Sequence, residues 1–219
     1  CGVSEHTSES FQNVFPELAQ KVRTVENSLP RELTRKQAAM PQTDMPAGDG
    51  ISLLSVGRFC EAKNFDNVPD ICRRMVVGGL DVKWYLIGYG GDEPLIRQKI
   101  DEAGMQERVI ILGKKDNPYP YMRACDLYVQ PSCYEGKAVT VREAQLLGKP
   151  VVITDYATSD SQLEDGVDGV IVPMDNASCA AEIAALLRDP ARMQQLSENC
   201  AKRDYTNGAE VEKIYALME

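Results

Sequence analysis

The sequence predicts an α/β protein with a Rossmann-like, doubly wound parallel sheet and extra helices toward its C-terminal end. Two observations lead to this prediction. From about residue 51, short apolar runs alternate with amphipathic stretches, and those stretches carry helix start and stop signals. Strands of a parallel sheet are buried on both faces, so each is expected to be continuously apolar. Helical spacers between such strands are typical of βαβ units.

Six apolar runs are expected to form the strands. In chain order they are Ile51–Val56, Trp84–Ile87, Val109–Leu112, Leu127–Gln130, Val151–Ile153 and Gly169–Val172. The best-marked helix between them starts at Asp92-Glu93-Pro94 and ends before Gly104, with acidic residues in its first turn and glycine after its last.

After Pro173 the pattern becomes helical. A helix is expected over Ala180–Leu187, ending before Pro190, and a second from there toward Tyr205. A third is expected at the end of the chain.

Residues 40–50 are rich in Pro, Gly and Asp and lack periodicity, so we interpret them as a linker or surface loop. That interpretation separates residues 1–39 from a domain over residues 51–219. Because the sequence starts without Met, within an apparent strand-to-loop segment, we expect it to be a fragment of a longer protein.

Composition narrows the function. The net charge of -9 argues against broad electrostatic capture of nucleic acid or of an anionic membrane surface, so any polyanion needs a local basic pocket. Seven cysteines without a C-x-x-C pair suggest neither a disulfide framework nor a zinc site. No apolar run approaches the roughly 18 residues of a membrane span. We therefore expect reduced thiols and a cytoplasmic location.

The stretch from Pro131 to Pro150 carries the most chemistry. It reads as a strand, a turn at Glu135-Gly136 and a helix to Gly148, a unit that points backbone N–H groups at anionic ligands. On an ideal helix Glu135 and Glu143 would lie about 12 Å apart. Paired carboxylates of retaining glycosidases sit roughly 5–5.5 Å apart, so these two cannot form one acid–base pair. Glu135 and Glu143 could bind the two ends of a long ligand. Taken singly, each is equally well explained as a solvated charge.

Two cations follow the first predicted strand, Arg58 and Lys63. Two cations at the carboxyl end of a strand could bind an anionic ligand such as a phosphate and stabilise negative charge that develops on it. The sequence has no Asp-x-Asp, so a divalent-metal clamp is unsupported and we expect neither metal nor cofactor. Without supporting motifs, both side chains would be ordinary surface charges.

Three motifs together resemble the family-four glycosyltransferases of GT-B fold: Glu135-x7-Glu143 with Gly148-Lys149-Pro150, Gly57-Arg58-Phe59-x3-Lys63, and Gly88-Tyr89-Gly90-Gly91-Asp92-Glu93. The resemblance covers roughly residues 51–190. It implies that Glu135 is the catalytic residue that contacts the donor sugar and that Glu143 binds the nucleotide ribose. The donor diphosphate would be bound by Gly57, Arg58, Lys63, Gly136, Lys137 and Ala138, and the nucleotide-site loop would be formed by Gly88, Gly90 and Gly113.

The same resemblance implies the reaction. A retaining, metal-independent enzyme would move a sugar from a nucleotide-diphosphate sugar to a glycan or lipid-linked acceptor, as bacterial capsular and surface polysaccharide enzymes do. Residues 1–39 would end the N-terminal acceptor domain, residues 51–219 would form the donor domain, and the chain alone would be inactive. Membrane association, if it exists, would be peripheral, at the inner face of the plasma membrane, through the missing N-terminal domain.

One position departs from the family pattern. Many members have Gly-Phe-Gly after the first Glu, whereas Lys137 and Ala138 follow Gly136 here. Lys137 is either a third cation near the donor or a solvent-facing lysine. The only histidine, His6, is interpreted as a surface residue at a helix start, so no histidine relay is expected.

Three alternatives stay open. A nicotinamide-dependent oxidoreductase is disfavoured because Glu93 occupies the third glycine position after Gly88 and Gly90. A sugar-nucleotide epimerase can share the two-domain architecture but lacks the E-x7-E signature. A catalytically silent nucleotide-sugar-binding module would look the same in this part of the sequence.

Overall fold

The computed structural model describes residues 1–42, 44, 45, 48 and 50–216. Part of the predicted linker, at residues 43, 46, 47 and 49, lies outside the described residues.

The strands are β1 (Ile51–Val56), β2 (Val82–Ile87), β3 (Val109–Gly113), β4 (Leu127–Gln130), β5 (Val151–Thr154) and β6 (Val170–Val172). The α-helices are α1 (Glu5–Val14), α2 (Arg31–Ala38), α3 (Val68–Val77), α4 (Glu93–Ala103), α5 (Tyr119–Ala124), α6 (Val139–Leu146), α7 (Ser159–Gln162), α8 (Asn176–Leu187), α9 (Pro190–Lys202) and α10 (Ala209–Ala216). Short 3-10 helices are η1 (Pro16–Lys21), η2 (Glu61–Lys63) and η3 (Phe65–Asn67).

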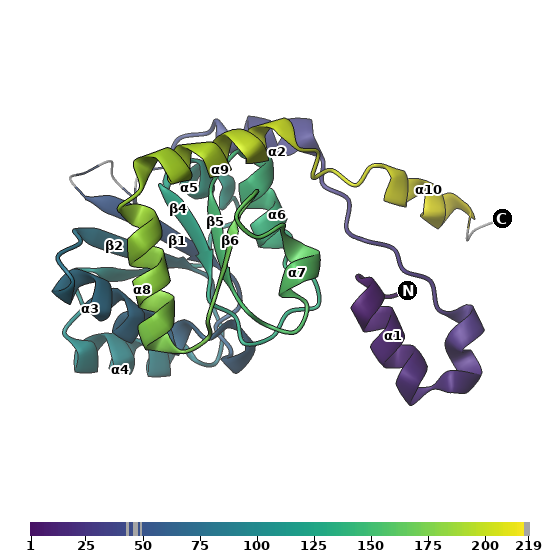
Figure 1. Ribbon diagram of the computed structural model, residues 1–219, viewed down its shortest axis with the longest axis horizontal. Coiled ribbons are helices and arrows are strands. Elements are labelled where there is room, and N and C mark those ends of the chain that lie inside the picture. The colour runs from purple at the N-terminus through teal and green to yellow at the C-terminus, as the bar shows by residue number, and fades with distance from the viewer. Residues whose placement is uncertain (43, 46–47, 49, 217–219) are drawn as a thin grey trace.

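The six strands form one parallel sheet in the order β3-β2-β1-β4-β5-β6 (Figure 1). The prediction of a doubly wound parallel α/β sheet is therefore confirmed. The chain builds outward from β1 in one direction, through β2 and β3, and then returns to pair β4 with the other side of β1. Ligands of such sheets bind where the strand order reverses, outside the carboxyl ends of the strands. In this sheet that switch point lies between β1 and β4.

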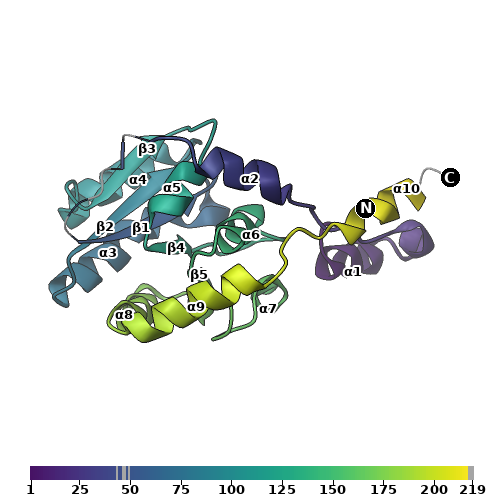
Figure 2. The ribbon, with the colours of Figure 1, turned by 90° about the horizontal axis from the view of Figure 1, so that it is seen from above.

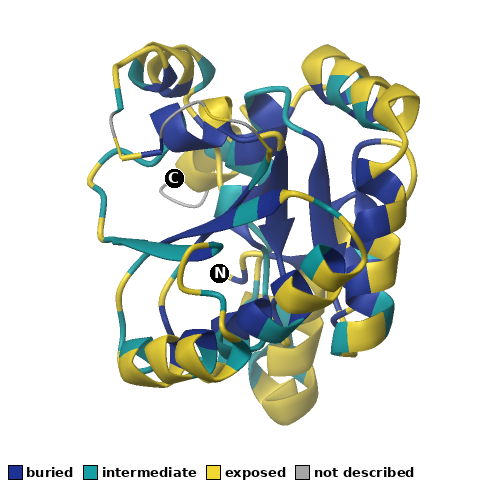
Figure 3. Cartoon of the chain, turned by 90° about the vertical axis from the view of Figure 1, so that its left-hand side faces the viewer, coloured by how far each residue is buried: buried dark blue, intermediate teal, exposed yellow. Residues whose placement is uncertain are grey.

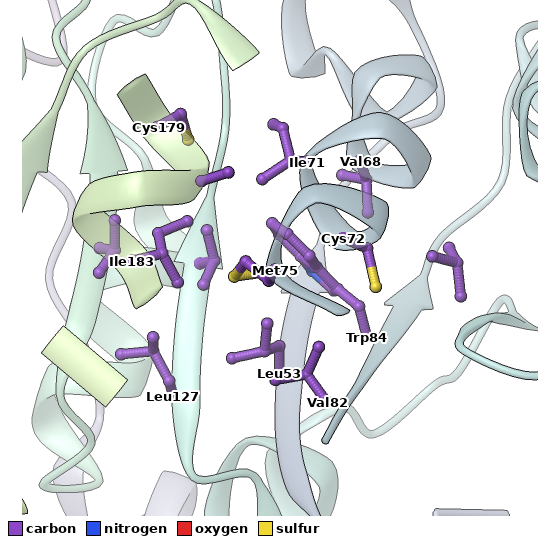
Figure 4. Packing of buried hydrophobic residues seen from close by; sticks show 14 of the residues in the cluster. Leu53, Val68, Ile71, Cys72, Met75, Val82, Trp84, Leu127, Cys179 and Ile183 are labelled. Carbon is purple, nitrogen blue, oxygen red and sulfur yellow. The ribbon is translucent and has the colours of Figure 1, made fainter. Parts of the chain in front are cut away.

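Both faces of the sheet are covered, as Figure 3 shows by the dark strands between helices with exposed outer sides. Side chains of successive residues point to opposite faces. Leu53 and Trp84 pack with α3, α4 and α8, whereas their neighbours Leu54 and Tyr85 pack with α5 and α6. Figure 4 shows the first of these two layers. Because most strand residues are buried between the two helical layers, the runs are largely apolar, which is the pattern that predicted them. The edge strand β3 is only half-buried beyond Val109.

The observed helices differ from the predicted ones at their ends. The helix predicted to begin at Ala180 begins at Asn176, because the Asp175 carboxylate accepts the backbone N–H of Ser178 and caps the helix there. The last-but-one helix ends at Lys202 rather than near Tyr205. Around Gly104 the prediction is confirmed: this residue ends α4 with a φ of 66°, a conformation that suits glycine.

The observed bounds of the strands differ less from the predicted ones. β2 starts at Val82, two residues before the predicted Trp84, since Val82 pairs with Ile51. β6 starts at Val170 rather than Gly169. None of the described helices has the length and apolar character that crossing a bilayer requires.

Residues 1–29 and α10 lie at one side of the sheet domain and project away from it (Figures 1 and 2). Two chain segments cross to this part, residues 22–30 and residues 203–208. Hydrogen bonds tie the crossings together: Leu29 N–H donates to Thr206 O at 2.8 Å, and the Glu26 backbone N–H donates to the Glu210 carboxylate at 2.9 Å. His6 is exposed in the first turn of α1, as predicted.

Candidate functional site

The candidate site lies at the carboxyl edge of the sheet, where the loops after β1 and β4 meet. These two strands are neighbours at the switch point. Lys63, at the end of η2 in the loop after β1, donates to Glu135, in the loop after β4, with 2.5 Å between Nζ and Oε1. Two residues predicted separately are thus joined across the switch point.

Glycines allow the neighbouring loops to pack closely at the same edge. A Cβ at Gly88 would lie 1.9 Å from the carbonyl oxygen of Gly57, and one at Gly90 would lie 2.1 Å from that of Phe59. The backbone pairing of the sheet continues through these loops, because Gly57 N–H donates to Ile87 O and Gly88 N–H donates to Gly113 O, each at 3.0 Å. The predicted glycines 57, 88 and 113 therefore lie side by side.

The loop after β4 is held from both sides. From the β1 side, the Asn64 side-chain amide donates to Pro131 O at 3.0 Å, and Ala62 O accepts the N–H of Cys133 at 3.0 Å. From the β5 side, the Thr154 hydroxyl donates to Ser132 O at 2.5 Å, and the hydroxyl of Thr158 donates to Glu135 O at 2.7 Å. The position of the Glu135 backbone is therefore fixed by neighbours on both strands.

The Glu135 side chain is only 9% exposed. Its Oε1 accepts two hydrogen bonds, from Lys63 and from the Ser132 hydroxyl at 2.7 Å. Among the described residues, none makes a hydrogen bond or ion pair with Oε2. A buried carboxylate needs a paired cation and hydrogen-bond donors, and Glu135 has both on one oxygen. The other oxygen is left as a strong acceptor for a ligand.

Arg58 follows Gly57 at the end of β1. Its side chain is exposed and makes no hydrogen bond or ion pair with any residue that the structure describes. The second predicted cation therefore differs from Lys63, which is already paired. An unpaired guanidinium beside the switch point can meet an anion without first breaking a contact.

Glu143 lies on α6 and is partly buried. The Tyr119 hydroxyl, on α5, donates to its Oε1 at 2.7 Å. Burial raises the pKa of the Glu143 carboxyl, and the hydrogen bond from Tyr119 partly offsets that rise. The alternative of a fully solvated helix residue is therefore wrong for Glu143.

Lys137 does not face solvent. Its side chain is 7% exposed, and its Nζ lies 2.5 Å from Oε1 of Glu26 on the first crossing segment. Arg142 approaches the other oxygen of Glu26 at 3.1 Å, and Asn207 from the second crossing donates to that same oxygen at 2.9 Å. Lys137 is thus the third cation near this loop, with a protein carboxylate as its partner.

Gly136 and Ala138 flank Lys137. A Cβ at Gly136 would lie 3.4 Å from the hydroxyl of Thr7 on α1, so the projecting part reaches this loop. The backbone N–H of Ala138 donates to the Gln162 side chain at 2.7 Å and is not free for a phosphate oxygen. Gly57 and Ala138, two of the predicted diphosphate contacts, therefore have backbone N–H donors that are already used within the protein.

Sequence reasoning missed four residues of this site: Gln130, Ser132, Tyr119 and Tyr156. Tyr156 follows β5, is 2% exposed, and has a hydroxyl without a hydrogen-bond partner in the described part of the chain. Burial and then the charge of Glu135 raise the pKa of this hydroxyl. Gln130, Ser132 and Tyr156 stand at or just after strand ends, whereas Tyr119 begins α5, and nothing in the local sequence distinguishes these four residues from other polar residues.

A family model described as glycosyl transferases group 1 matches residues 39–203. Among curated proteins, the chain is 28% identical over 152 residues to an alpha-D-kanosaminyltransferase of Streptomyces kanamyceticus, covering 68% of this chain and 39% of that protein. It is 30% identical over 133 residues to a lipopolysaccharide core biosynthesis mannosyltransferase of Rhizobium meliloti, covering 58% and 38%. The chain thus spans well under half the length of these relatives.

Solved structures share the fold. HepE of Anabaena in complex with UDP-glucose superposes with a TM-score of 0.81 at 20% identity, covering 98% of this chain and 63% of that one. TarM superposes with a TM-score of 0.78 at 19% identity, covering 100% and 43%.

Proposed function

Because the chain belongs to the glycosyl transferases group 1 family, we propose that it binds the nucleotide-diphosphate sugar of a retaining, metal-independent glycosyltransferase. The observation that carries the proposal is the Lys63–Glu135 pair across the switch point, with Arg58 unpaired beside it. This arrangement places positive charge and a buried carboxylate where a doubly wound sheet binds anionic ligands.

Each end of the donor has a proposed partner. Lys63 uses one of its three ammonium protons on Glu135, so two remain for phosphate oxygens. Arg58 supplies a guanidinium, which suits two phosphate oxygens at once. Oε2 of Glu135 accepts from a sugar hydroxyl, and Glu143 accepts from the ribose hydroxyls. In this proposal the cations stabilise the leaving diphosphate without a metal.

The stereochemical proposal follows from how Glu135 is held. Its Oε1 already accepts from an ammonium and a hydroxyl, which lowers its suitability as a covalent nucleophile. We propose that it stabilises charge at the sugar, while a donor phosphate oxygen takes the acceptor proton and the anomeric configuration is retained. NMR of the product tests this step, and an inverted anomeric carbon would contradict it.

The acceptor side is proposed from the projecting part. Residues 1–39 would belong to the acceptor domain, since α1 reaches Gly136 beside the donor loop. Two relatives suggest the acceptor class: one is named for lipopolysaccharide core biosynthesis, and another, from Campylobacter jejuni, for sugar transfer to a diphospho-undecaprenol carrier. We propose a glycan or lipid-linked acceptor in surface polysaccharide synthesis, at the inner face of the plasma membrane.

Calorimetry with UDP, GDP and ADP tests the donor proposal. We expect at least one nucleoside diphosphate to bind with equal affinity with and without EDTA, because Arg58 and Lys63 replace the metal. Binding that requires magnesium or manganese would refute metal independence. Failure of all three nucleotides to bind would refute the donor site itself.

Paired substitutions separate the two ends of the donor. Glu143→Gln should weaken nucleotide binding about tenfold, because a charge-assisted hydrogen bond contributes about 1.5–3 kcal/mol. Glu135→Gln should leave nucleotide binding nearly intact, since Glu135 is assigned to the sugar. Equal losses at the two positions would contradict these roles.

The pH dependence of nucleotide binding should report on Glu143. Burial raises the pKa of this carboxyl, so its ionised form is lost as pH falls, sooner than for an exposed Glu. Tyr119→Phe removes the hydrogen bond that lowers this pKa, so we expect the affinity to start falling at higher pH than in the unaltered protein. Calorimetry at several values between about pH 5 and 8 measures the shift.

Tyr121→Phe is the matched control for this experiment. Its hydroxyl lies on the same helix but contacts Asp44 rather than Glu143. The nucleotide's own titration affects all three proteins equally. An identical pH profile for Tyr119→Phe and Tyr121→Phe would rule out the proposed link between Tyr119 and Glu143.

A further inference from the structure

A chain of buried hydrogen bonds runs along β4 and ends on Glu135. The Tyr128 hydroxyl bonds Gln130 Oε1 at 2.9 Å, Gln130 Nε2 bonds the Ser132 hydroxyl at 3.0 Å, and that hydroxyl bonds Glu135 Oε1 at 2.7 Å. Tyr128, Gln130 and Ser132 each have 0% exposure. Tyr128 and Gln130 are two residues apart on β4, so their side chains point to the same face, and Ser132 lies two residues beyond the end of that strand.

The direction of every bond follows from the end of the chain. A carboxylate can only accept, so the Ser132 hydroxyl donates its proton to Glu135. The Ser132 oxygen must then accept, and only the amide N–H₂ of Gln130 can donate to it. This orients the Gln130 carbonyl toward Tyr128, whose hydroxyl donates. Reversing the Ser132 bond would leave two oxygens 2.7 Å apart with no proton between them.

We call the hydrogen-bonded chain of Tyr128, Gln130 and Ser132 the relay. Its backbone is held in place as well as its side chains. Thr154 fixes the carbonyl of Ser132, and Asn64 fixes that of Pro131. Since Gln130 and Ser132 lie beneath Glu135 and are fully buried, they do not reach a ligand themselves. Their contacts determine which oxygen of the Glu135 carboxylate accepts hydrogen bonds from the protein.

We propose that Gln130 and Ser132 are positioning residues that saturate Oε1 of Glu135 and so leave Oε2 as the oxygen that meets the donor sugar. The proposal rests on the function proposed above, because it assigns the sugar to Glu135. Lys63 alone would let the carboxylate rotate about its ammonium, since an ammonium is a point charge without a preferred direction. The hydrogen bond from the Ser132 hydroxyl fixes the orientation of the Glu135 carboxylate.

Two substitutions test the relay. Ser132→Ala removes the donor to Glu135, and Gln130→Met removes the amide that donates to Ser132 while keeping a side chain of similar length, so that the Ser132 hydroxyl is no longer held toward Glu135. The measured quantity is the ratio of UDP affinity to UDP-glucose and UDP-N-acetylglucosamine affinity, by calorimetry on the full chain. We expect both variants to lose about tenfold or more of the affinity that the sugar adds, with UDP binding nearly unchanged.

Ser55→Ala is the matched control, because Ser55 is a fully buried serine of the neighbouring strand whose hydroxyl donates to Val129 O and accepts from Trp84. It should lower stability and leave the ratio unchanged. Equal changes in the ratio for Ser55→Ala and Ser132→Ala would refute the relay.

Crystal structures of the two variants give a readout that does not depend on the substrate. We expect the Glu135 carboxylate to leave its position beside Ser132 in both. If it stays in place in both variants, the relay is refuted whatever the nucleotide affinities are. If the unaltered protein binds UDP but gains nothing from either sugar, the assignment of Glu135 to the sugar fails, and the relay is judged on the crystal structures alone.

Discussion

Replacing Lys63 by Met is expected to lower the free energy of unfolding by about 3 kcal/mol and to weaken nucleoside diphosphate binding about a hundredfold. The stability loss arises because Glu135, 9% exposed, would lose the ammonium that is paired with it. The binding loss arises because a charge-assisted contact to phosphate contributes about 1.5–3 kcal/mol. Urea denaturation measures the first effect and calorimetry the second.

The double variant Lys63→Met with Glu135→Gln separates these effects. Neutralising the carboxylate should recover most of the lost stability, while diphosphate binding should remain weak. Arg97→Met is the control: Arg97 pairs with Glu93 on the surface of α4 at 2.7 Å, with 59% of its side chain exposed. Its loss should cost less than about 0.5 kcal/mol. A stability change at Lys63 as small as that at Arg97 would contradict a buried, coupled pair.

Gly90→Ala is expected to destabilise the protein by about 3 kcal/mol or more and to abolish donor binding. The added Cβ would lie 2.1 Å from the carbonyl oxygen of Phe59 and 2.8 Å from its backbone nitrogen. Backbone atoms cannot rotate out of the way, so the loops after β1 and β2 would have to separate. That separation would displace Arg58, which precedes Phe59. Urea denaturation and calorimetry measure both losses.

Gly91→Ala provides the control in the same loop. A Cβ there would meet nothing within 4 Å, and Gly91 has no positive φ, so stability should change by less than about 0.5 kcal/mol. If Gly90→Ala were as neutral as Gly91→Ala, the close packing of the two loops would not be a requirement of the fold.

The sheet could be predicted because its inner strands are buried on both faces. Residues such as Leu53 and Leu54 must both be apolar when helices cover both sides, so the run itself marks the strand. The order of the strands has no such local mark. Only the structure shows that β4 returns to pair with β1, which is what brings the Lys63 and Glu135 loops together.

Helix α6 shows a limit of reading the motif alone. The sequence suggested a helix directly after Glu135-Gly136, but α6 begins at Val139, so Glu135 stands in a loop. The helical estimate of the separation between Glu135 and Glu143 therefore does not apply to this chain. The conclusion that they do not form one acid–base pair agrees with their different partners, Lys63 with Ser132 for one and Tyr119 for the other.

Lys137 shows why some partners cannot be predicted from local sequence. Its carboxylate partner, Glu26, lies 111 residues earlier, on a segment outside the sheet. Nothing near either residue indicates the contact. The roles proposed for Arg58, Lys137 and Glu143 stay predictions until a ligand is bound.

The two crossing segments near Glu26 have a mechanical consequence. Within the part of the chain that the structure describes, they are the covalent links between the sheet domain and the projecting part, and hydrogen bonds at Leu29 and at Asn207 join them to each other. Two chain segments joined in this way act as one hinge. Residues 1–25 and α10 are therefore expected to rotate together rather than separately. Glu26 lies on the first of these segments and also pairs with Lys137 in the loop after β4 and with Arg142 on α6, so a rotation of the projecting part would displace that loop and that helix.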